Sequence, residues 1–134
     1  STIVGLVFGI YPALRAANQT MRQHFEARNI EGYLDANIAF HEAILDATRN
    51  EPLRKSIEVL NEMAQPIRYA LLASRFEKSS ALGEHEQIIG LLERGDLAAA
   101  ADAIEQHVLR NIDSASGLYR TDAPAPQTTA PGKR

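Results

Sequence analysis

The chain of 134 residues contains no cysteine and no tryptophan. Without cysteine it cannot form disulfides, and any metal ion must be held by nitrogen and oxygen ligands. Long hydrophobic runs are missing as well. The apolar stretch from Ile3 to Ile10 is interrupted by Gly5 and Gly9, is too short to cross a bilayer, and lacks the basic start and cleavage pattern of a secretory signal. We therefore expect a cytoplasmic protein with no membrane association.

Basic charge and β-forming residues are also scarce. The net charge is −3, so the chain has no general attraction for nucleic acid. There are four tyrosines and four phenylalanines, and runs of β-branched residues are rare. Alanine and leucine dominate a sequence that is 45% hydrophobic, a composition that favours helices. The length and composition predict one all-α domain, a helical bundle with a real core.

Proline, glycine and capping residues mark the expected helix boundaries. Pro12 is suited to the first position of a helix, and Pro66 should kink or divide a longer one. Gly95-Asp96 supplies a C-terminal cap followed by a new N-cap. These signals predict about six helices within residues 13–120. We expect residues 1–12 to form an arm or an altered first helix, and residues 121–134 to form a disordered tail.

Three histidines, His41, His85 and His107, each fall on the apolar face of a different predicted helix. Imidazole is a poor core residue and a good metal ligand. Asn37 lies one turn before His41, on the same side of its helix. A divalent metal ion would give the three imidazoles a common partner. The alternative is that each histidine is a core residue hydrogen-bonded to a carbonyl group.

Four segments together resemble the FCD domain, the effector-binding domain of FadR-type GntR-family bacterial transcription regulators, over about residues 13–111. In chain order they are Asn37-Ile38-Ala39-Phe40-His41 followed by Ala47-Thr48-Arg49-Asn50, then Glu84-His85-Glu86-Gln87-Ile88-Ile89, Gly95-Asp96, and Ala100-Ala101 before His107.

The resemblance implies an antiparallel bundle with a central cavity for a divalent metal, zinc or nickel. It identifies His41, His85 and His107 as ligands and puts Asn37 where the family usually has aspartate. An asparagine can ligate through its carbonyl oxygen, although it is a weaker donor than a carboxylate.

The resemblance also implies a partner and a mode of action. The effector would be a small organic acid, with Arg75 and Arg68 as residues that could bind its carboxylate. We expect a homodimer and no enzymatic activity. DNA would be bound only through a winged helix-turn-helix domain, which is absent from this chain.

Two other functions stay open from the residues alone. Three histidines with an open coordination position would suit a metal-dependent hydrolase, which also needs a general base. Glu84 and Glu86 flank His85 but point away from the helix face that carries it, so neither is a convincing base. The third possibility is a dimerising bundle without metal. A fourth histidine, His24, is expected to be structural or exposed.

Overall fold

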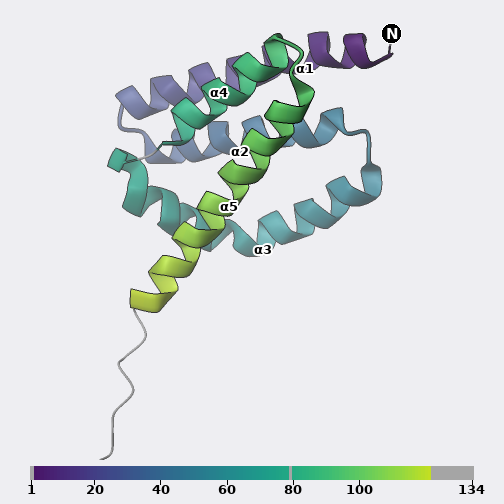
Figure 1. Cartoon of the computed structure of the whole chain (residues 1–134). Helices are drawn as coiled ribbons and strands as arrows, with labels where there is room; N and C mark the ends of the chain where they lie inside the picture. Colours follow the sequence, from purple (N-terminus) through teal and green to yellow (C-terminus); the bar gives the residue numbers. More distant parts are fainter. Residues whose placement is uncertain (1, 79, 122–134) are drawn as a thin grey trace, which may run out of the picture.

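The computed structural model describes residues 2–78 and 80–121, with side chains over 10–73, 76–77, 80–113 and 116–117. These residues form five α-helices, one short 3₁₀-helix and no strand (Figure 1). The elements are α1 (Thr2–Glu26), α2 (Ile30–Ala47), α3 (Glu51–Arg75), η1 (Phe76–Lys78), α4 (Ala81–Glu93) and α5 (Leu97–Thr121). The all-α prediction is confirmed, whereas the tail expected over 121–134 lies outside the described residues from 122 onward.

The expected helix start at Pro12 is wrong, Pro66 does not divide its helix, and the described residues form five α-helices rather than about six. Pro12 lies inside α1 and does not begin it. Pro66 lies inside α3, which continues to Arg75 as one helix. A proline leaves the carbonyl four residues earlier without its amide partner. Pro66 and Glu62 are both exposed, so water can satisfy that carbonyl and the helix persists.

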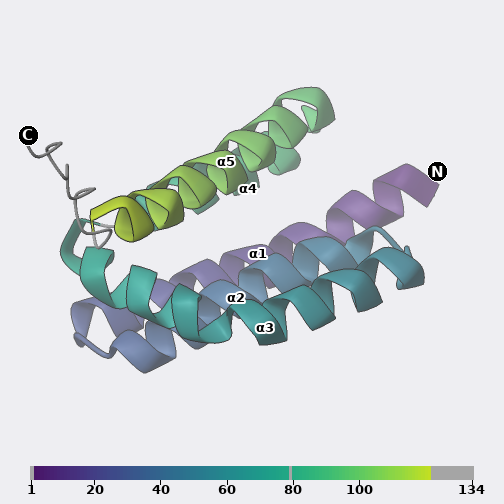
Figure 2. The same ribbon diagram turned by 90° about the horizontal axis from the view of Figure 1, so that it is seen from below.

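The helices form two layers. Seen from below, α1, α2 and α3 run side by side in one layer, and the α4–α5 pair lies over it (Figure 2).

The turns between the helices are short. At the end of α1, Arg28 has a φ of 54° and Asn29 caps α2 by accepting a hydrogen bond from the Gly32 amide. Gly95, with a φ of 73°, ends α4 in the same left-handed conformation, as expected from Gly95-Asp96.

Two clusters of buried side chains hold the layers together. One lies where α4 and α5 meet α1 and α2, and the other lies where the start of α2 meets the end of α1, η1 and the start of α4. The buried members are Leu14, Phe40, Ile88, Ile89, Leu92 and Ala100 in the first cluster, and Met21, Tyr33, Ala36, Phe76 and Leu82 in the second. Because the first cluster joins α2, α4 and α5, it brings three distant parts of the sequence to one place.

A hollow lies to one side of this core. A cavity of about 400 Å³ opens between α2 and α3, with Leu34, Ile38 and Leu45 on its α2 wall. None of the three histidines lines it, so the expected central cavity is not confirmed. Within the described residues, no helix is both long and apolar enough to cross a membrane.

Candidate metal centre

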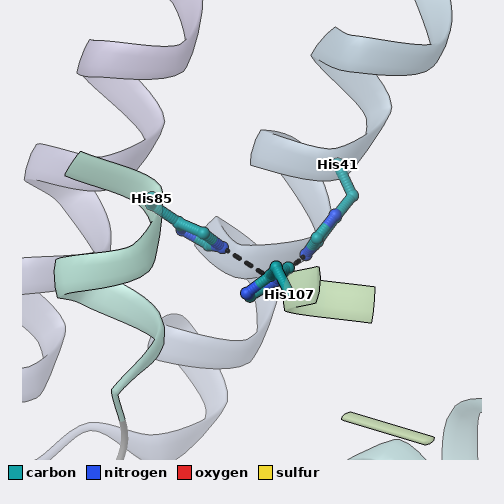
Figure 3. A group of neighbouring side chains, drawn as sticks. All are labelled: His41, His85 and His107. Carbon is teal, nitrogen blue, oxygen red and sulfur yellow. Dashed lines mark hydrogen bonds between the residues drawn. The ribbon is translucent and has the colours of Figure 1, made fainter. Parts of the chain in front are cut away.

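Three imidazoles from three helices meet inside the bundle. His41 comes from α2, His85 from α4 and His107 from α5, and their rings face one another (Figure 3). The Nε2 atom of His107 lies 3.4 Å from Nε2 of His85 and 3.3 Å from Nε2 of His41. Each ring contributes one nitrogen atom, and these three nitrogens all lie within 4.8 Å of one another. The convergence expected from the helix faces is therefore present.

The core fixes the position of His85. Its ring is fully buried and stacks on Phe40, with ring centroids 3.7 Å apart and an interplanar angle of 4°. Phe40 precedes His41 on α2, so one helix supplies both a ligand candidate and the wall behind another. The stacking directs His85 Nε2 toward His107 and leaves His85 Nδ1 buried with no hydrogen-bond partner among the described residues.

A carboxylate fixes the orientation of His107. Its Nδ1 lies 2.5 Å from Oε2 of Glu84. Ser80 and Arg110 also donate to Glu84, at 2.6 and 3.1 Å. Burial raises the pKa of Glu84, but the hydrogen bonds from Ser80, His107 and Arg110 outweigh that effect and lower it. A carboxylate only accepts hydrogen bonds, so Nδ1 of His107 carries the hydrogen and the Nε2 lone pair faces the cluster.

That single lone pair has three neighbours. Besides the two imidazoles, Nδ2 of Asn111 lies 3.3 Å from His107 Nε2. One lone pair cannot form a hydrogen bond with all three neighbours, and His85 Nδ1 has no partner among the described residues. Hydrogen bonding within the described residues therefore leaves the cluster incomplete.

Two of the imidazoles, those of His41 and His85, are held in the neutral form. Burial, followed by the effects of His107 and Arg68, lowers the pKa of His41 from 6.5 to about 3. Burial, followed by the effects of His41 and His107, lowers the pKa of His85 from 6.5 to about 2. Neutral imidazole is the form that binds metal ions. These two candidate ligands are thus in the required protonation state.

The spacing also fits a metal ion. Two nitrogens that are each about 2.0–2.1 Å from a tetrahedral zinc ion lie about 3.3–3.4 Å apart. The two Nε2 separations at His107 are 3.3 and 3.4 Å. Three histidines can therefore hold a zinc-like ion and keep a fourth position open.

The other predicted site residues fall in three different places. Asn37 is buried one turn before His41, and no hydrogen bond joins it to the three imidazoles among the described residues. Arg68 is half-buried, lines the cavity between α2 and α3, and is close enough to His41 to lower its pKa. The side chain of Arg75 lies outside the described residues. His24 is half-buried at the end of α1, 3.2 Å from Asn29, in agreement with the structural role expected of it.

Sequence reasoning missed the roles of Glu84 and Asn111. The sequence predicts that Glu84 points away from the helix face that carries His85. In the structure, Glu84 contacts the outer nitrogen of His107 on the next helix. No spacing within one helix indicates such a contact between two helices. Asn111 does carry a signal, since it lies four residues after His107 on the same helix face.

The model of the family described as the FCD domain matches residues 10–110 of this chain. No curated protein matches the chain. No solved structure matches it either.

Proposed function

The chain belongs to the FCD family, the effector-binding domains of GntR-family regulators, and from this premise we propose that it senses a small organic acid through a divalent metal ion. The observation that carries the proposal is the meeting of three imidazoles inside the bundle with incomplete hydrogen bonding. His41, His85 and His107 would hold the ion, zinc or nickel. When bound, it would supply a Lewis-acidic position for an anionic group.

Of the two predicted effector-binding arginines, Arg68 is the one whose side chain the structure describes. Its Nη1 donates to Asn61 at 2.8 Å, and no carboxylate of the described residues lies within ion-pair distance of its guanidinium. A half-buried arginine that faces a cavity without an acidic partner can bind a carboxylate through two parallel hydrogen bonds. Its influence on His41 links that cavity to the imidazole cluster.

The charges around the cavity limit the effector. Besides Arg54 and Arg68, the wall carries Glu42, Asp46, Glu58 and Glu62, so four acidic groups face two basic ones. Arg54 already pairs with Glu51 and Glu58. A compact acid with one carboxylate near Arg68 fits this wall better than a polyanion, which the acidic groups would repel.

The effector would act by changing the population of two bundle conformations. This requires that it bind them with different affinities, and the difference in binding free energy would be passed to the DNA-binding domain of the full regulator. We retain the homodimer as part of this proposal.

A metal-dependent hydrolase is the less favoured alternative. Such an enzyme needs a base near the open metal position. Glu84 is occupied by His107, Ser80 and Arg110 on the outer side of the cluster. Glu86 contacts Arg15 and Asn18. Neither carboxylate near His85 is available as a base, which supports a regulatory function.

The test compares the response to acetate of the zinc-loaded and metal-stripped proteins. A ligand at about 100 times its dissociation constant that binds only the folded state adds about 2.7 kcal/mol of stability. We expect this gain with zinc and little gain without it, measured by thermal unfolding at constant ionic strength with chloride as the control anion. Equal gains in both forms would exclude the metal ion from effector binding.

A further inference from the structure

One exposed residue lies at the edge of the imidazole cluster. Asn111 is on α5, one turn after His107, and its Nδ2 lies 3.3 Å from His107 Nε2. His41 Nε2 lies at the same distance from that atom. The carboxamide of Asn111 therefore belongs to the same shell of atoms as the imidazole nitrogens, on its solvent-facing side.

The hydrogen bond made by Asn111 depends on a lone pair that a metal ion would take. Glu84 accepts the hydrogen of His107 Nδ1, so Nε2 of His107 can only accept from Asn111. A lone pair donated to a metal ion no longer accepts a hydrogen bond. Loading the site would leave the N–H of Asn111 without its acceptor, next to the cluster.

Two sides of the cluster are covered. Phe40 stacks behind His85, and Glu84 lies behind His107. His85 and His107 are both buried and His41 is half-buried, whereas Asn111 is exposed. On the α5 side, a small ligand that reaches the open metal position from solvent passes beside the carboxamide of Asn111.

We propose that Asn111 is an effector-contact residue, and that its amide N–H donates to the carboxylate oxygen of an acid bound at the three-histidine centre. The inference rests on the proposed function and extends it, because Arg68 lines the cavity between α2 and α3 and does not account for this position. A neutral donor suits the place, since a positive side chain beside the metal ion would weaken metal binding by charge repulsion.

The experiment uses the full chain loaded with zinc and titrated with acetate. In Asn111→Ala we expect zinc affinity to stay within about twofold of the wild type, because the ligands remain. Acetate affinity should fall by about tenfold or more, because a hydrogen bond to a charged group is lost. The matched control is Gln106→Ala, which removes an exposed amide from the same helix. It should change neither affinity.

A second variant keeps the shape of the side chain and reverses its role. Asn111→Asp presents an acceptor-only carboxylate in the same place, so the acetate response should disappear while zinc remains bound. Equal acetate affinity in the wild type and Asn111→Ala would overturn the role of Asn111 and leave the proposed function intact. No acetate response in the zinc-loaded wild type would overturn both. A loss of zinc affinity beyond tenfold in Asn111→Ala would make Asn111 a metal ligand and overturn its role as a donor.

Discussion

At the turn between α1 and α2, His24 is half-buried and its Nδ1 lies 3.2 Å from Nδ2 of Asn29, the residue that caps α2. Its ring lies against the backbone of α2, where a Cβ on Gly32 would clash with Nδ1. At the α2–α4–α5 cluster, by contrast, His41, His85 and His107 face mainly one another. One region satisfies its histidine with neighbours close in sequence, and the other assembles three that lack sufficient partners.

This difference separates a structural histidine from a ligand candidate. The Nδ1 of His24 faces a neutral amide, whereas the Nδ1 of His107 faces a carboxylate at 2.5 Å. A carboxylate on the outer nitrogen orients an imidazole and raises the basicity of its inner nitrogen, as is common around metal ligands. The histidines thus differ in the group that contacts the outer ring nitrogen as well as in burial.

The largest expected effect comes from removing a ligand of the cluster. His85→Ala or His107→Ala should lower zinc affinity by more than about 100-fold, because even the loss of a group behind a ligand costs about 10–100-fold. His24→Ala, the matched control from the other region, should bind about one zinc ion per chain, like the parent. Elemental analysis and titration against a competing chelator measure both. If the two cluster variants bind zinc as tightly as the parent, the site is wrong.

Acid should destabilise the metal-free protein through the cluster. The pKa of His41 is about 3 and that of His85 about 2 in the folded chain, against 6.5 for the free side chain. Below pH 6.5 the unfolded chain therefore binds more protons than the folded chain. The free energy of unfolding then decreases as the pH is lowered toward the pKa values of the folded chain. Each histidine contributes up to about 1.4 kcal/mol per pH unit, or about 2.7 kcal/mol for the two.

Denaturant unfolding with a chelator present, at several pH values between 7 and 5, measures this slope. His85→Leu should reduce the slope by about half, since one of the two groups is removed. His24→Ala should not reduce the contribution of the cluster. A parent slope that stays flat through this window would show that the buried imidazoles do not resist protonation.

Removing the charge behind His107 tests the second difference between the two regions. Glu84→Gln preserves the size of the side chain and removes the charge, so zinc affinity should fall by about 10–100-fold. Glu86→Gln is the matched control, because Glu86 is adjacent to His85 in sequence and pairs with Arg15 instead. Circular dichroism of the metal-free variants shows whether they remain folded. Equal zinc affinity in the two variants would mean that Glu84 does not support the metal centre.

The sequence predicted the histidine faces well because helical periodicity depends only on local spacing. It could not predict Glu84 behind His107, since α4 and α5 bring these residues together through tertiary packing. It predicted that Pro66 would kink or divide a helix, and exposure on the outer side of α3 lets that helix continue without division. The cavity lies between α2 and α3 for a similar reason, because its position depends on how the two helices pack and on no motif.

Asn37 gives the smallest expected effect and decides how far the cluster extends. It is buried one turn before His41, where the family pattern has aspartate. If its oxygen ligates the metal, Asn37→Asp should tighten zinc binding about tenfold, or about 1.4 kcal/mol, because a charged donor offsets part of the metal's charge in a buried site. The control Gln106→Glu adds the same charge on the exposed side of α5. It distinguishes a carboxylate that contacts the metal ion from the electrostatic effect of one more negative charge on the protein. Unchanged zinc affinity in Asn37→Asp would place residue 37 outside the ligand set and leave the three imidazoles as the only protein ligands predicted from the sequence.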